Sequence, residues 1–148
     1  MNQRRANANH QGTRLSTAIG RSNNCLMLDE IKRVYQTFGD AVVEKIEYAT
    51  TPEDGNAKSL HVHLHCLNWE TQQWQDITLI FTNVTHFQYL ENRRVQSCVV
   101  FEAFLQQGPR GIVVDFYPIQ VDGLGLLAED PQSSFLLHCQ AIRYVVRA

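Results

Sequence analysis

The sequence predicts an α+β domain in which one N-terminal helix packs on a strongly bent, mainly antiparallel sheet of six to seven strands. Two observations predict this fold class. Apolar residues recur at three- and four-residue steps only near the start of the chain, which is the spacing of a helix. Later segments alternate apolar and polar residues and are separated by short turn-like stretches, which is typical of β-hairpins.

The helix is expected over residues 28–38. Its apolar residues follow the helical repeat: Leu28, Ile31, Val34, Tyr35 and Phe38. Asp29 and Glu30 favour the positive end of the helix dipole in the first turn. Gly39 is the expected stop signal, because glycine readily adopts the left-handed conformation in which many helices end.

Most of the remaining chain is predicted to form strands, with a turn or short extension at 84–87. In chain order the expected strands are 41–49, 59–68, 73–82, 95–105, 111–119 and 134–146. The second and third of these form one expected hairpin, and the fourth and fifth form another. Residues 50–57 and 123–132 contain Pro and Gly and are expected as a turn and a loop. The inward face of the last strand is predicted to consist of Phe135, Leu137, Cys139 and Ala141.

Composition and charge describe a single soluble domain behind a basic tail. A folded chain of 148 residues buries roughly 68–70% of its unfolded surface. Residues 1–24 contain four arginines and no acid, whereas residues 25–148 contain 9 basic and 15 acidic residues, a net charge of −6. We expect a flexible tail over 1–24 and one α+β domain over 25–148. No basic stripe, secretion signal or apolar run of ~20 residues is present, so we expect a cytoplasmic protein that binds neither nucleic acid nor membrane.

The strongest candidate for chemistry is a run of alternating histidines, His61, His63 and His65. Because a strand sends successive side chains to opposite faces, the three imidazoles are expected on one face. Imidazole is a common metal ligand, so His63 and His65 are candidate ligands, with His61 or Asp76 of the next strand as a third. The simpler interpretation is an exposed polar strand face, which requires no cofactor.

Two carboxylates form a second candidate site. Glu102 and Asp115 lie in the two strands of the second expected hairpin, each within an apolar run. Opposed across a hairpin, they could form an acid/base pair with separated pKa values. They could also both point outward to solvent, as polar residues of an antiparallel sheet commonly do.

The cysteines and the common enzyme motifs give little support to catalysis. Cys25, Cys66, Cys98 and Cys139 are widely spaced, with no Cys-x-x-Cys pair, and we expect reduced thiols; a disulfide between adjacent strands is the alternative. The sequence contains no Gly-x-Ser-x-Gly, no Gly-x4-Gly-Lys-Ser/Thr and no Gly-x-Gly-x-x-Gly.

Several short motifs follow one another between residues 28 and 146. The expected helix ends in Phe38-Gly39-Asp40, and a Leu-x-Val-x-Leu strand follows at 60–64. Residues 77–87 have the pattern Ile-Thr-Leu-x-Phe-x-x-Val, and residues 134–142 have Ser-Phe-x-x-x-Cys-x-x-Ile. This order resembles one immunity-protein family of bacterial polymorphic toxin systems and its uncharacterised relatives. The family has Phe-His-Asp in the first motif, so Gly39 stands here in place of a histidine.

The resemblance implies a protein that acts by binding rather than by chemistry, and it transfers no catalytic residue. The leading hypothesis is therefore a non-enzymatic bacterial cytosolic protein that neutralises a toxin by occlusion. The acidic domain suits this role, because complementary charge speeds association with a basic partner. One alternative is a metal-dependent enzyme that uses the face of His61, His63 and His65. Another is a self-associating domain, a homo-oligomer whose sheet edge pairs with a second copy.

Overall fold

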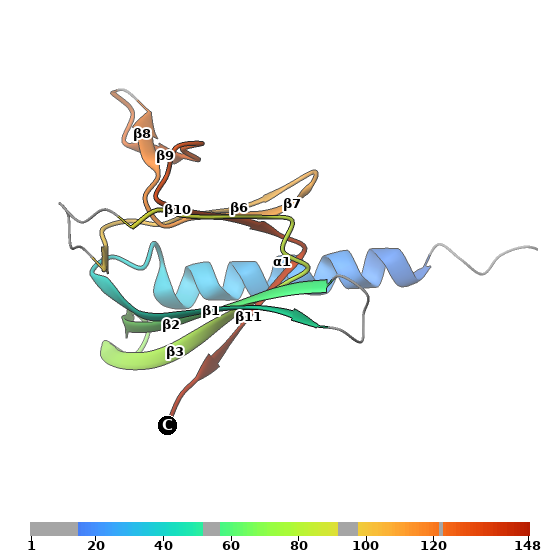
Figure 1. The fold of residues 1–148 in the computed structure, drawn as a ribbon. Helices are drawn as coiled ribbons and strands as arrows, with labels where there is room; N and C mark the ends of the chain where they lie inside the picture. Colours follow the sequence, from blue (N-terminus) through green and yellow to red (C-terminus); the bar gives the residue numbers. More distant parts are fainter. Residues whose placement is uncertain (1–14, 52–56, 92–97, 122) are drawn as a thin grey trace, which may run out of the picture.

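In the computed structural model, one helix lies between two antiparallel sheets (Figure 1). The structure describes residues 15–51, 57–91, 98–121 and 123–148. The helix is α1 (Leu15–Tyr35). The strands are β1 (Ala41–Thr51), β2 (Ala57–Asn68), β3 (Gln73–Thr82), β4 (His86–Tyr89), β5 (Val99–Val100), β6 (Phe104–Gly108), β7 (Gly111–Asp115), β8 (Ile119–Val121), β9 (Leu126–Ala128), β10 (Phe135–Cys139) and β11 (Ala141–Val146).

The strands divide among three sheets rather than forming the single sheet of six to seven strands that the sequence predicts. Five strands have the order β11-β3-β2-β1-β5, four have the order β4-β10-β7-β6, and β8 pairs with β9 alone. All the pairings are antiparallel, so the α+β class and the antiparallel arrangement are confirmed. Helix α1 contacts β2 and β11 of the larger sheet and β6 of the smaller one.

The hairpin of β2 and β3 agrees best with the sequence. Strand β3 has the predicted bounds, and its inward residues Ile77, Leu79 and Phe81 are buried as their alternation predicts. The strand expected at 95–105 is not continuous in the structure. Residues 95–97 lie outside the described residues, and the rest divides between β5 and β6. The expected strand at 111–119 ends at Asp115, since Pro118 cannot donate a backbone hydrogen bond to a ladder.

The expected strand at 134–146 is broken at Gln140, which lies in a bend between β10 and β11. Cys139 and Ile142 both point into the core, so the alternation shifts by one residue and Ala141 is only half-buried. At this bend the chain crosses from the four-stranded to the five-stranded sheet. The crossing from β3 to β4 runs beside it: Gln140 N donates to Thr82 O at 3.2 Å, and Thr85 N donates to His138 O at 2.9 Å.

The helix has different ends from those predicted. It begins at Leu15, inside the segment expected as a tail. The sequence does not predict this first part of the helix, because residues 15–24 contain too few apolar residues to show a helical repeat. Residues 1–14 lie outside the described residues, so the expected tail stays a prediction there. The helix ends before Gly39: Gln36 adopts a left-handed φ of 52°, and its N–H donates to Lys32 O at 3.0 Å.

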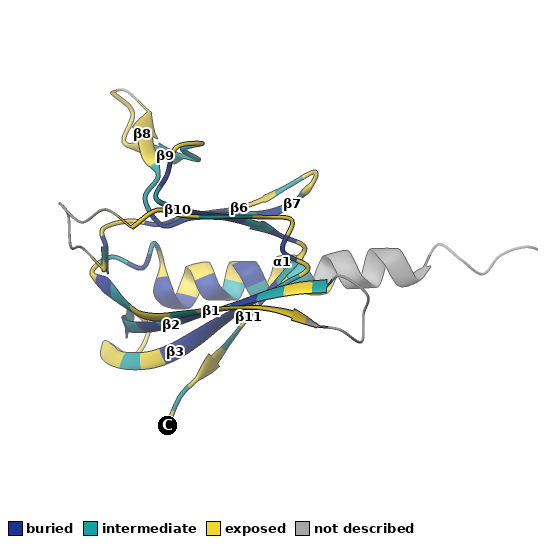
Figure 2. Ribbon diagram, in the orientation of Figure 1, coloured by how far each residue is buried: buried dark blue, intermediate teal, exposed yellow. Residues whose placement is uncertain are grey.

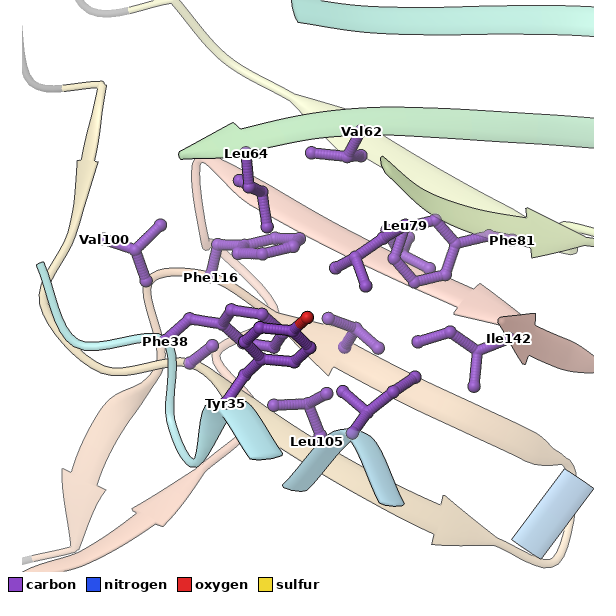
Figure 3. Close-up of a cluster of buried hydrophobic side chains, with 14 of the residues drawn as sticks. Tyr35, Phe38, Val62, Leu64, Leu79, Phe81, Val100, Leu105, Phe116 and Ile142 are labelled. Carbon is purple, nitrogen blue, oxygen red and sulfur yellow. The ribbon is translucent and has the colours of Figure 1, made fainter. Parts of the chain in front are cut away.

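The core fills the space between the two sheets (Figure 2). Every residue that the apolar repeat assigns to the core is buried, from Leu28 in α1 to Phe38 just after it. The Tyr35 and Phe38 rings stack with centroids 5.6 Å apart, and Leu105 and Phe116 lie near them (Figure 3). The thiols of Cys66 and Cys139 belong to this core, and burial raises the pKa of each to about 12. All four cysteines are free; Cys25 and Cys98 are exposed.

Gly111 is the backbone position that this arrangement constrains most. Its φ is +125°, and a Cβ atom added there would lie 2.5 Å from the Cys139 carbonyl oxygen beside the bend.

We therefore expect Gly111→Ala to lower the free energy of unfolding by about 1–3 kcal/mol. Gly108, in the same hairpin, has ordinary Cβ space, 3.5 Å from Gly111 O. Gly108→Ala is the control and should change stability by less than about 0.5 kcal/mol in urea unfolding. Equal effects of the two substitutions would contradict the steric explanation.

Candidate functional site

The candidate metal ligands lie on the side of the five-stranded sheet that faces away from the helix. Along β2 the apolar residues are buried, whereas His61, His63 and His65 are partly exposed and share the opposite face. The register places His63 opposite Thr78 and His65 opposite Asp76 on β3. We call this outer side of β1, β2 and β3 the histidine face.

Two of the three imidazoles are paired with carboxylates. His63 lies 2.6 Å from Glu47 through Nε2, and its Nδ1 lies 3.1 Å from the Thr78 hydroxyl. His65 lies 2.6 Å from Asp76 through Nδ1 and stacks on the Trp74 ring, with centroids 5.2 Å apart. Both nitrogens of His63 are thus occupied, and Asp76 binds an imidazole instead of standing free as a metal ligand.

These contacts favour ion pairing over metal binding. Among the described residues, which include all three histidines and Asp76, no three His, Cys, Asp or Glu side chains form a group suited to a metal ion. Within the described residues no third ligand lies beside His63 and His65, and metal binding by these two histidines stays a prediction. On an exposed face, an imidazole and a carboxylate that pair chiefly fix one another's orientation.

Charges on the histidine face largely cancel one another. Lys45 lies 2.7 Å from Glu47, and Arg147 lies 2.6 Å from Glu44. The ammonium group of Lys45, followed by the imidazole of His63, lowers the pKa of Glu47 to about 2. The face therefore carries short ion pairs, one within β1 and one between β1 and the residue that follows β11, whose cations and anions neutralise each other.

Glu102 and Asp115, the second candidate pair, lie in different environments. Glu102 is exposed in the connection between β5 and β6, while Asp115 is fully buried at the end of β7. The prediction that both carboxylates point to solvent is thus wrong for Asp115, and so is the alternative of a shared acid/base site. Asp115 is buried because donors surround it: Ser133 Oγ at 2.5 Å, Tyr117 N at 3.0 Å and Asp130 N at 2.8 Å.

Asp115 fastens both ends of a projecting hairpin. Strands β8 and β9 stand off the four-stranded sheet as a two-stranded arm (Figure 1), and we call residues 119–128 the arm. Tyr117 precedes the arm and Asp130 follows it, and both donate backbone N–H groups to the Asp115 carboxylate. Next to Asp130, Glu129 lies 2.6 Å from His138 of β10. Residues 115–117 and 129–130, which we call the root of the arm, therefore hold it to the sheet on both sides.

The arm differs from the sequence-based expectation, which places a loop at residues 123–132. A local signal was available. Asp122-Gly123 is a dipeptide that favours tight hairpin turns, and short apolar segments flank it: Ile119-Gln120-Val121 before it and Leu126-Leu127-Ala128 after it. The burial of Asp115 has no comparable signal, since its partners Asp130 and Ser133 come from a distant part of the chain.

Three comparisons with known proteins were made. No family model, no curated protein and no solved structure matches this chain. The resemblance to an immunity-protein family therefore stays a prediction from the motifs. Among the described residues, no helix is both long and apolar enough to span a bilayer.

The depressed pKa of Glu47 predicts how stability depends on pH. Because the folded protein favours the charged carboxylate, its contribution is fully present above the ordinary value of 4.5 and is lost as pH falls through about 2. We expect Glu47→Gln to be less stable than the native protein at neutral pH, with the difference shrinking between pH 4.5 and 2. Urea unfolding at several pH values measures this. Glu102→Gln is the control, and a difference that does not depend on pH would contradict the ion-pair assignment.

Asp115 gives a prediction about the root of the arm. Asp115→Asn replaces an acceptor oxygen by an NH₂ group that faces buried donors, so we expect a loss of about 2–3 kcal/mol in unfolding free energy. The exposed carboxylate variant Glu102→Asn should change stability by less than about 0.5 kcal/mol. Hydrogen exchange should also become faster at the Tyr117 and Asp130 amides. Unchanged exchange at both amides would show that the carboxylate does not hold the arm.

Proposed function

We propose that this chain is a non-enzymatic binding protein that blocks a basic protein partner by covering part of its surface. The immunity proteins that its motifs resemble act in this way, and the proposed partner is accordingly a toxin in the same cell. The proposal includes a bacterial, cytosolic setting, because such a toxin must be neutralised where it is made.

The observation that carries the proposal is a contrast in charge between two surfaces. On the histidine face, Lys45 and Arg147 are paired with carboxylates, so little net charge remains there. The segment from residue 111 to 142, which contains the arm and its root, has no Lys or Arg, and its partly exposed acids Glu129 and Asp130 directly follow the arm, whereas Asp115 is buried. A surface that carries acids and no basic residue attracts a partner of opposite charge and speeds its association.

Co-expression with the protein encoded by the adjacent gene tests the proposal. We expect that protein alone to arrest growth of a bacterial host and this chain to restore growth by forming a complex. Because the attraction is between charges, the association rate of the purified pair should fall by roughly tenfold or more between low and high salt. A harmless neighbour, or growth arrest that this chain does not relieve, would contradict the proposed function.

A further inference from the structure

We infer that the arm is the part of this chain that inserts into the partner, and that it fits an apolar cleft rimmed by Lys and Arg side chains. The inference rests on the proposed function, since it requires a protein partner. It adds which surface binds and what chemistry the partner must present.

The arm carries an unusual concentration of exposed apolar side chains. Leu124 is 70% exposed and Leu126 is 59% exposed, and Ile119 and Val121 are also exposed. The register pairs Val121 with Leu126 and Ile119 with Ala128, so these four side chains lie on one face of the hairpin. Contiguous exposed apolar groups of this kind mark interaction sites more often than scattered single residues do.

The apolar surface continues at the root of the arm. Tyr89 ends β4 and Leu90 follows it, and both are about half exposed. Leu90 N donates to Ser134 O at 2.8 Å, and Tyr89 packs edge-on against Phe135, so both lie beside the segment that carries Asp130 and Ser133. The candidate surface therefore extends from the tip of the arm to the edge of the four-stranded sheet.

The root holds the arm in place before any partner binds. An isolated two-stranded hairpin is only marginally stable in water. Here the Asp115 carboxylate accepts hydrogen bonds from both ends of the hairpin, and the Glu129–His138 contact adds a second attachment. A binding element that is already ordered loses less conformational entropy on association than a flexible loop.

The acidic residues beside the arm indicate which kind of partner surface it fits. The acidic residues Glu129 and Asp130 directly follow the arm, and the sequence has no Lys or Arg between Arg110 and Arg143. A second copy of this chain would bring acids against acids, which disfavours self-association through the arm. A cleft with an apolar floor and a basic rim matches both the apolar side chains and the surrounding carboxylates.

Two aspartate substitutions test the inference, with the growth-arresting neighbour protein, in an inactivated form, as the probe. Leu126→Asp and Val145→Asp each replace an exposed aliphatic side chain by a carboxylate, so they change the net charge equally. Val145 lies on the outer side of β11, in register with Thr78 of the histidine face. We expect Leu126→Asp to weaken calorimetric binding by roughly 100-fold and Val145→Asp by less than about threefold.

The results of these binding measurements distinguish a failure of the inference from a failure of the proposed function. If the native chain binds the probe and Leu126→Asp binds equally well, the arm is not the docking element, although the proposed function stands. If the native chain does not bind the probe, the proposed function itself fails. Light scattering at rising concentration should show a monomer; a dimer that Leu126→Asp dissociates would make a second copy the occupant and overturn the inference. Urea unfolding of both variants confirms that each is folded, and Leu126→Met should retain binding.

Discussion

Burial of one helix between two sheets is the constraint on which the rest of this structure depends. Ile31 and Tyr35 of α1 must be covered from both sides, so the inner faces of both sheets are apolar. Among the described strands the chain passes from one sheet to the other four times, between β3 and β4, β4 and β5, β5 and β6, and β10 and β11. The outer faces are then left to polar and charged residues. On the five-stranded sheet these form the histidine face, and on the four-stranded sheet the root of the arm covers part of the surface.

The same constraint explains how much of the fold the sequence predicts. Helix α1 and the β2–β3 hairpin follow from local periodicity, because each buries one regular face against the core. The break at Gln140 does not, since the predicted strand face of Phe135, Leu137 and Cys139 is buried up to the point where the chain changes sheets. The burial of Asp115 is harder still to predict, because whether a carboxylate is buried depends on its donors. Here these are Tyr117, Asp130 and Ser133, around a hairpin whose second half was expected as a loop.

The histidines show that the spacing of residues along one strand predicts their chemistry less well than the residues that neighbouring strands place beside them. Three imidazoles do share one face, as alternation requires, yet neighbouring strands supply Glu47 and Asp76 at hydrogen-bond distance from His63 and His65. A carboxylate that pairs with an imidazole orients it and uses one of its nitrogens. The cross-strand neighbours, which single-strand periodicity cannot show, therefore decide between an ion-pair surface and a metal site.

The buried carboxylate at the root of the arm is best explained by the arm itself. An apolar residue at position 115 would extend the core between β7 and β10 and would avoid the cost of desolvating a charge. It would not, however, accept hydrogen bonds from Tyr117 and Asp130, which are the two points where the chain leaves and rejoins the sheet. The hydrogen bonds offset the desolvation cost and fix the direction of a hairpin that has little core of its own. Asp115 thus links the packed interior, which the helix organises, to the exposed apolar surface through which we propose that the protein binds.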